Sequence, residues 1–264
     1  MLQETRLHRI RALLSTLGQV STERIIKELG ISRETARRDI IVLQAQGLAK
    51  RVHGGLVALD ATPEPPLTVR SSVMAKEKRA IARTAARLLQ PGQTVFLDAG
   101  STTTMLAEEL RTMSGLTVIT NSLNAALKLC AAEEDETLNN QVILLGGSMQ
   151  AGAQETRGEL TVGEIYRYRA DVALLSPVGI EQNHGASSFH PHEAAIARAM
   201  THQASRLILL ADHSKLGINS RLNYAGIHQV STLVTDSSAA ALPAFVALNQ
   251  VLPEVVLAPT SRCG

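Results

Sequence analysis

The sequence predicts an α/β protein in which a winged helix-turn-helix is followed by a mostly parallel α/β domain. Two short amphipathic helices joined by a glycine turn occupy residues 20–47. Residues 1–59 contain 10 Lys/Arg and 5 Asp/Glu, a net charge of +5, whereas residues 60–264 contain 16 and 19, a net charge of −3. Farther along, short β-rich runs alternate with helical ones. We therefore predict one domain over 1–59, a linker over 60–75 and a second domain over 76–264.

The first predicted helix, Leu2–Leu17, has apolar residues at helical spacing and should pack across the next two helices. Arg6, Arg9 and Arg11 lie on or near its exposed side, where we expect them to reach a DNA backbone.

The next two helices carry their own start and stop signals. Ser21 and Ser32 are expected N-caps, and Gly30 and Gly47 can adopt the positive φ that ends a helix. The second of these helices has a buried stripe of Ile31, Ala36, Ile40 and Leu43. This arrangement is a helix-turn-helix.

The exposed side of the second helix is basic. We expect its N-terminal part to read base edges and Arg38 to bind a phosphate. The base-reading candidates are Ser32, Arg33, Thr35 and Arg37. The alternative is that Arg37 and Arg38 form only a solvated helix face.

A hairpin wing is predicted over residues 48–57, where Gly54 and Gly55 separate two apolar runs. Lys50, Arg51 and His53 are its candidates for contacts with the DNA backbone or minor groove.

Residues 6–56 resemble the N-terminal winged helix-turn-helix of the DeoR-type bacterial transcriptional regulators. That family has Thr, a small or apolar residue, Arg-Arg-Asp and a following Leu, which are here Thr35, Ala36, Arg37, Arg38, Asp39 and Leu43. Its wing also contains a Gly-Gly pair, as at Gly54 and Gly55.

The predicted linker includes DATPEPPL at 60–67, where prolines favour extended chain. A helix is expected over 76–89, ended by Pro91 and Gly92. Strands are predicted at 94–97, 116–119, 142–145, 172–175, 207–210, 232–234 and 255–257, and helices at 103–110, 124–132, 164–168, 192–204 and 239–249. This alternation indicates a mostly parallel sheet covered on both faces.

Small and polar residues follow four of the predicted strands, at 98–103, 120–122, 146–148 and 211–217. Ligands of open α/β sheets bind beyond the carboxyl ends of the strands. Backbone N–H groups and hydroxyls at a helix start suit an anion, and Lys215 adds a cation. Alternatively, these residues only cap helices and turns.

The same segments resemble, in order, motifs of the DeoR-type C-terminal sensor domain. That domain is similar in fold to ribose-5-phosphate isomerase and glucosamine-6-phosphate deaminase and binds phosphorylated sugars or related metabolites. The resemblance implies effector contacts from Asp98, Gly100, Ser101, Thr102, Thr103, Asn121, Gly147 and Lys215. Residues 176–181, Ser-Pro-Val-Gly-Ile-Glu, depart from the glycine-rich stretch of many relatives.

Other constellations predict little. His190, His192 and Glu193, with His213 elsewhere, invite a metal, but they lack the i, i+4 pairing of a helical zinc site. We expect His192 or Glu193 to line the effector pocket or cap a helix. The adjacent residues 212–214, Asp-His-Ser, do not form a catalytic line. We expect no catalytic residues, metal or cofactor.

Composition narrows the function classes. There is no Trp, and 3 Tyr and 3 Phe argue against a stacking platform for single strands. The 2 Cys are too few for a disulfide framework. With no signal peptide or long apolar run, the chain is expected in the cytoplasm without membrane contact.

The leading hypothesis is a transcriptional regulator, a repressor of a carbohydrate or related catabolic operon that a phosphorylated sugar or similar metabolite releases from double-stranded operator DNA. Paired half-sites imply a homo-oligomer, a dimer or tetramer. The alternative is a sugar-phosphate isomerase or deaminase with a DNA-binding head, in which Glu181 is the only candidate general base in its stretch. A nucleoid protein without effector would leave the four segments unexplained.

Overall fold

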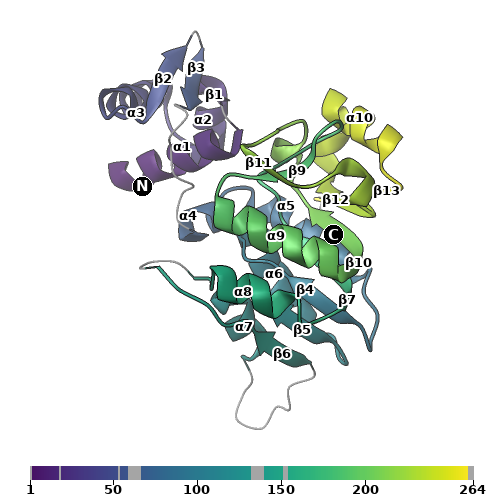
Figure 1. Ribbon diagram of the computed structural model, residues 1–264. Coiled ribbons are helices and arrows are strands. Elements are labelled where there is room, and N and C mark those ends of the chain that lie inside the picture. The colour runs from purple at the N-terminus through teal and green to yellow at the C-terminus, as the bar shows by residue number, and fades with distance from the viewer. Residues whose placement is uncertain are drawn as a thin grey trace. The chain divides into compact units, whose positions relative to one another are not determined.

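The computed structural model describes residues 2–17, 19–52, 54–58, 67–131, 140–150 and 154–260 (Figure 1). The chain divides into two compact units, Met1–Val73 and Met74–Gly264.

The first unit contains the predicted helix-turn-helix and wing. Its elements are α1 (Gln3–Leu17), β1 (Gln19–Ser21), α2 (Thr22–Leu29), α3 (Arg33–Ala45), β2 (Ala49–Val52), β3 (Gly55–Ala58) and α4 (Leu67–Ser72). Ser21 and Ser32 cap α2 and α3, each accepting a backbone N–H bond, and Gly30 ends α2 with a φ of 60°. These three predictions are confirmed. α4 occupies part of the predicted linker, and residues 59–66 lie outside the described residues.

The wing strands β2 and β3 pair antiparallel, and a third strand that the sequence did not predict, β1, pairs with β3. The two wing glycines serve different needs. Gly54 has a φ of +85°, which L residues rarely adopt, while a Cβ on Gly55 would lie 2.3 Å from the carbonyl oxygen of Val20. The sheet therefore needs glycine at both positions.

An ion pair fastens α1 to α3. Arg6 Nε donates to Asp39 Oδ2 at 2.7 Å, and a second guanidinium nitrogen donates to Asp39 Oδ1 at 3.1 Å. Asp39 is fully buried, so its charge needs this partner. The guanidinium of Arg6 is thus engaged by Asp39, and a contact of Arg6 with the DNA backbone stays a prediction.

The second unit alternates helices and strands. Its first half contains α5 (Ala75–Ala86), β4 (Thr94–Leu97), α6 (Ser101–Leu110), β5 (Thr117–Thr120), α7 (Leu123–Leu129), β6 (Gln141–Leu144) and α8 (Glu159–Ile165). The second half contains β7 (Ala170–Leu175), β8 (Gly179–Glu181), β9 (Gly185–Ser188), α9 (Pro191–Gln203), β10 (Ala204–Leu210), β11 (Leu222–Ala225), β12 (Thr232–Asp236), α10 (Pro243–Val251) and β13 (Glu254–Ala258), with 3₁₀ turns η1 (His213–Lys215), η2 (Ile227–Gln229) and η3 (Ser237–Ala241).

Seven strands form one sheet in the order β13-β12-β10-β7-β4-β5-β6, and every neighbouring pair is parallel. Alternate strand residues face two separate cores. One core joins α5, α6 and α7 to side chains such as Val95 and Leu97, and the other joins α8, α9 and α10 to Phe96 and its neighbours (Figure 1). The predicted parallel sheet covered on both faces is confirmed.

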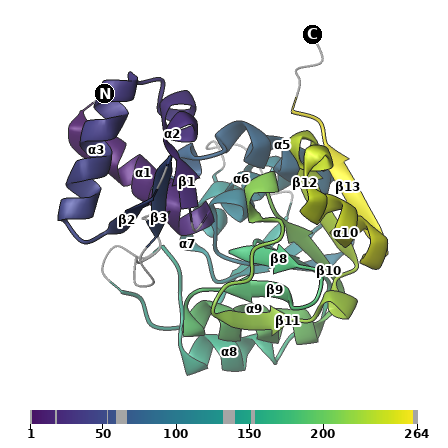
Figure 2. The same ribbon diagram turned by 90° about the horizontal axis from the view of Figure 1, so that it is seen from above.

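A small antiparallel sheet, in the order β11-β9-β8, lies beside α9 (Figure 2). The sequence did not predict it. Two helices also differ from their predicted ranges, since α8 ends near where we expected it to begin and α10 starts only at Pro243.

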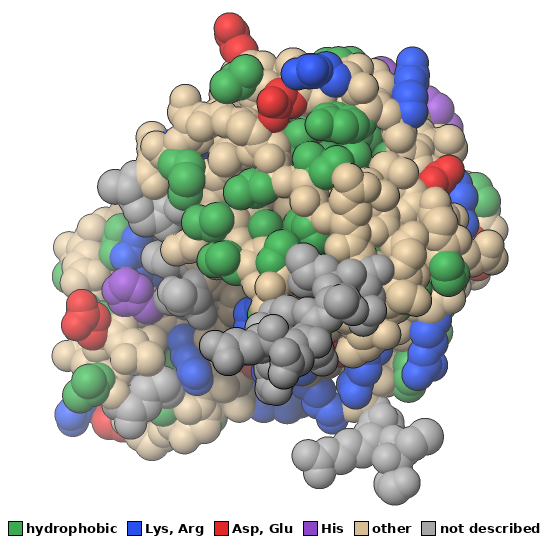
Figure 3. Space-filling view, turned by 90° about the horizontal axis from the view of Figure 1, so that it is seen from below, with side chains coloured by type: hydrophobic (Ala, Val, Ile, Leu, Met, Phe, Trp, Pro, Cys, Tyr) green, Lys and Arg blue, Asp and Glu red, His purple; other side chains and the backbone are tan. Residues whose placement is uncertain are grey.

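The sheet ends at β6 on one side. Figure 3 views the molecule from the side on which β6, α7 and α8 lie in Figure 1, and hydrophobic side chains gather there. The exposed large hydrophobic side chains on these elements are Leu127, Leu144 and Leu160, and Tyr166, just after α8, is exposed too. Among the described helices, none is both long enough and apolar enough to cross a membrane.

Candidate functional site

A basic groove in the first unit lies between the helix-turn-helix and the wing. Arg33 and Arg37 line it from α3, and Arg51 lines it from β2, with Gly54 and Gly55 at the turn. All three arginine side chains are exposed. The groove thus brings together cations from the two elements that the sequence predicted for DNA contact.

The remaining DNA candidates lie elsewhere. Ser32 Oγ lies 2.9 Å from Thr35 Oγ1 at the exposed start of α3. Arg38 forms an exposed pair with Glu34 at 3.3 Å, and Lys50 is exposed on β2. Neither Arg38 nor Lys50 lines the groove. His53 lies outside the described residues.

In the second unit, the predicted effector residues lie at the carboxyl edge of the seven-stranded sheet. Asp98 follows β4, Asn121 follows β5, Gly147 lies beyond β6, and Lys215 lies beyond β10. Parallel strands end at one edge, so these loops share it.

The N-terminus of α6 has the form of an anion cradle. Its first N–H groups have no acceptor within the helix, and Ser101, Thr102 and Thr103 are buried there. Thr103 Oγ1 donates to the Gly100 carbonyl at 3.1 Å, whereas Thr102 Oγ1 is buried without a hydrogen-bond partner. The fold thus leaves one hydroxyl of the cradle unused.

Asn121 is buried and holds two loops together. Its Oδ1 accepts from the Ala99 N–H at 3.1 Å, and its Nδ2 donates to the Thr156 carbonyl at 3.2 Å. The side chain therefore links the segment after β4 to the segment before α8.

Gly147 has no room for a side chain. Its φ is +152°, and a Cβ would lie 2.0 Å from Thr161 Oγ1 and 2.9 Å from the Arg157 carbonyl. The glycine lets the chain after β6 pass against the start of α8.

Lys215 Nζ donates to Ser176 Oγ at 3.1 Å and to the Pro177 carbonyl at 2.7 Å. A Cβ built on Gly100 would lie 3.8 Å from Ser176 Cβ. The residue that Lys215 contacts thus adjoins the start of α6.

The carboxyl edge of the sheet also contains a polar cluster. The sequence indicated only two of its members, His192 and Glu193 of α9. His192 Nε2 lies 3.5 Å from Glu155 Oε1 and 3.5 Å from an Arg157 guanidinium nitrogen, and Glu193 Oε2 accepts from Ser188 Oγ at 2.7 Å. Pro191 starts α9, as predicted. Glu155 and Arg157 had no sequence signal, because they follow no predicted strand.

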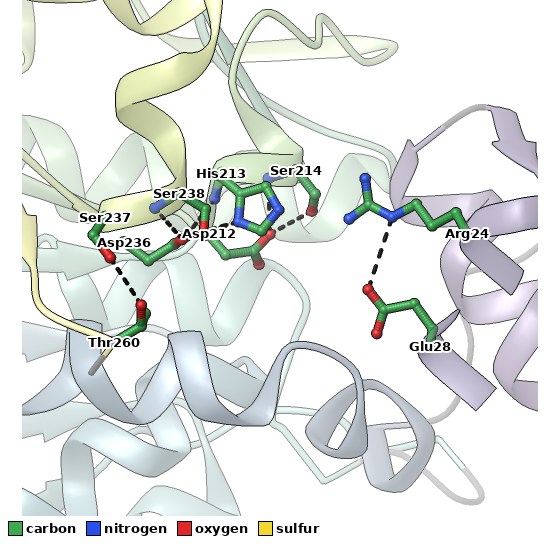
Figure 4. Close-up of polar contacts among 9 residues, drawn as sticks. All are labelled: Arg24, Glu28, Asp212, His213, Ser214, Asp236, Ser237, Ser238 and Thr260. Carbon is green, nitrogen blue, oxygen red and sulfur yellow. Dashed lines mark hydrogen bonds and ion pairs between the residues drawn. The ribbon is translucent and has the colours of Figure 1, made fainter. Parts of the chain in front are cut away.

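Asp212, His213 and Ser214 do not form a catalytic line (Figure 4). Asp212 Oδ1 accepts from Ser214, whereas His213 Nδ1 lies 3.0 Å from both carboxylate oxygens of Asp236. Burial raises the pKa of Asp236, but hydrogen bonds from the His213 side chain and N–H and from the Ser238 N–H outweigh burial, and the net pKa is lowered. The close-up also includes an ion pair within α2, in which Arg24 Nε lies 3.8 Å from Glu28 Oε1.

Comparison with known families gives two matches, which together cover most of the chain. Residues 6–62 match the DeoR-like helix-turn-helix domain, and residues 73–237 match the DeoR C terminal sensor domain. The chain belongs to the DeoR family. As a DeoR-family protein it is a transcriptional regulator with a DNA-binding head and a sensor domain.

Curated DeoR-family relatives align over most of their length. The glycerol-3-phosphate regulon repressor of Escherichia coli (strain K12) is 32% identical over 96% of this chain and 97% of its own. The HTH-type transcriptional repressor GlcR of Bacillus subtilis (strain 168) is 35% identical over 89% of each chain. Among solved structures, ribose 5-phosphate isomerase A from Methanocaldococcus jannaschii aligns with 54% of each chain at 16% identity and a TM-score of 0.39.

Proposed function

We propose that this DeoR-family regulator is a cytoplasmic repressor of an operon for carbohydrate or polyol catabolism and that a phosphorylated metabolite releases it from its operator. One observation supports the part of this proposal that concerns the effector. The N-terminus of α6 and the loops of Asn121, Gly147 and Lys215 meet at one edge of the sheet. The relatives named above as repressors, one of them of a glycerol-3-phosphate regulon, support repression.

The phosphate is assigned to the start of α6. N–H groups and hydroxyls there offer donors, and the helix dipole favours a negative charge. Thr102 Oγ1 lacks a partner that a phosphate oxygen would supply. We assign Ser101, Thr102 and Thr103 to the phosphate, with Gly100 and Lys215 beside it, and we assign Asp98, Asn121 and Gly147 to shaping the adjoining wall.

DNA contact is assigned to the basic groove and its rim. Arg33, Arg37 and Arg51 face the same groove and suit base edges and the adjacent backbone. Ser32, Thr35, Arg38, Lys50 and His53 are assigned to the surrounding contacts.

Regulation, not catalysis, is the activity that we assign to the second unit. Glu181, the sole carboxylate of residues 176–181, is bound by the N–H groups of Asn183 and His184 and by the His184 side chain. Burial raises the pKa of Glu181, but these bonds outweigh burial and lower it. A carboxylate held in this way is a poor general base.

The test is a thermal-shift screen of the whole protein against phosphorylated sugars and polyols, followed by fluorescence anisotropy on DNA selected from a randomised pool. A metabolite that binds only the folded state must raise the melting temperature. We expect at least one to do so and to weaken DNA binding.

Lys215→Ala should retain DNA affinity and lose the effector response, because the cation beside the phosphate is gone. Lys128→Ala, an exposed lysine on α7, is the matched control and should respond as the wild type does. An unchanged response of Lys215→Ala removes Lys215 from the site, and turnover of any sugar phosphate contradicts the regulator assignment.

A further inference from the structure

Tyr224 is a buried tyrosine without a hydrogen bond. Its side chain is 5% exposed, and its hydroxyl has no partner among the described residues. Burial and then the negative charges of Asp98 and Glu193 raise its pKa well above the usual 10.0. The hydroxyl is therefore neutral and keeps both its donor and its acceptor capacity. Strand β11, which contains Tyr224, packs against α9, which contains Glu193.

The neighbouring acid–histidine cluster consists of Glu155, His192 and Glu193. One ligand atom from each of the three lies within 4.8 Å of the others. The imidazole can donate or accept a hydrogen bond, and both carboxylates accept. Together with Tyr224, the cluster therefore offers both hydrogen-bond donors and acceptors.

This cluster belongs to the same sheet edge as the phosphate cradle. Asn121 binds Ala99, just before Gly100, and also binds Thr156, the neighbour of Glu155. Asp98, whose charge acts on Tyr224, lies two residues before Gly100. The cradle and the cluster thus lie on two segments that the Asn121 side chain joins.

We propose that Tyr224 and Glu193, with Glu155 and His192, form a subsite for the hydroxyl groups of the effector's unphosphorylated end, an inference that rests on the proposed function. Each hydroxyl of a polyol or sugar both donates and accepts, which matches neutral Tyr224 beside a carboxylate. A divalent cation fits less well, because the guanidinium of Arg157 lies 3.5 Å from His192 Nε2 and supplies positive charge there already.

The experiment is isothermal titration of the full-length protein with glycerol 3-phosphate, ribose 5-phosphate, glucose 6-phosphate, fructose 6-phosphate and inorganic phosphate. Tyr224→Phe and Glu193→Gln should each weaken the organic phosphate that binds the wild type by about ten-fold, as for one lost hydrogen bond. Inorganic phosphate should bind all three proteins within about two-fold, since it occupies only the cradle.

The unliganded Tyr224→Phe protein should melt no lower than the wild type, because the substitution removes an unpaired buried hydroxyl. Tyr166→Phe and Glu109→Gln repeat the two chemical changes outside the subsite and should leave every affinity unchanged.

Equal binding of the organic phosphate by wild type and both variants overturns the subsite and leaves the proposed function standing. An equal loss for inorganic phosphate also overturns it, as does a melting shift caused by Mn²⁺ alone that Glu193→Gln abolishes. A wild type that binds none of the organic phosphates overturns the subsite together with the proposed sugar-phosphate effector.

Discussion

Gly147 is a residue whose backbone and surroundings both exclude a side chain. Its φ of +152° is one that L residues rarely adopt, and the Thr161 hydroxyl occupies the place of a Cβ. Gly147→Ala should lower the free energy of unfolding by about 1–3 kcal/mol, measured by urea denaturation. Gly163→Ala is the control, since Gly163 lies in α8 with nothing within 4 Å of its Cβ position. Equal stability of the two variants contradicts this account.

Asp236 should make the second unit acid-sensitive. Its folded pKa lies below the ordinary value of 3.8. The contribution of Asp236 to the free energy of unfolding is thus fully present above pH 3.8 and is lost as the pH falls through the folded pKa. Asp236→Asn should cost about 1.5–3 kcal/mol near neutral pH, because a charge-assisted bond is replaced. Urea titrations at lower pH should show a smaller difference in unfolding free energy between this variant and the wild type. A difference that stays constant down to strongly acidic pH would contradict the proposed role of the Asp236 charge.

Sequence motifs pointed to some of the proposed effector residues and not to others. Thr102 and Lys215 were indicated because they follow strands in recognisable motifs. Tyr224 was not, since nothing local distinguishes a core tyrosine from one whose hydroxyl lacks a partner. The pair of Arg6 and Asp39 joins residues 33 positions apart. Such partners are set by tertiary packing, which periodicity does not encode.

Helix α3 should divide its arginines between two tasks. Arg37 lines the groove, whereas Arg38 lies outside it and pairs with Glu34. Arg37→Ala should lose about 1–3 kcal/mol on the selected operator and much less on random DNA. Arg38→Ala should weaken both DNAs evenly and reduce the salt slope by about 0.9. Arg83→Ala in α5 is the control for the loss of one positive charge. Fluorescence anisotropy at several salt concentrations measures the DNA affinity of each variant. Equal losses by both α3 variants on both DNAs would show that the division is wrong.

Elements with strong local signals were predicted well. The capped helices α2 and α3 and the β-branched strands of the large sheet appear close to their predicted ranges. The strands β8, β9 and β11 are only three or four residues long, and β9 consists of Gly, Ala and Ser alone. Strands this short give a weak local signal and form because neighbouring strands pair with them.

The whole protein should bind DNA as a symmetric oligomer. Helix-turn-helix heads recognise paired half-sites, so two copies are the minimum for a specific operator. Light scattering after size exclusion should give at least twice the 28.2 kDa of one chain at micromolar concentration. A monomer that still binds a single half-site with full specificity would contradict the expectation.

The ion pair of Arg6 and Asp39 ties α1 to α3, and side chains of α1, α2, α3 and the wing strands share one core. We therefore expect α3 to move together with the other described elements of the head. We expect the proposed effector to act on the distance or angle between two heads, so operators with altered half-site spacing should change the size of the response as well as the affinity.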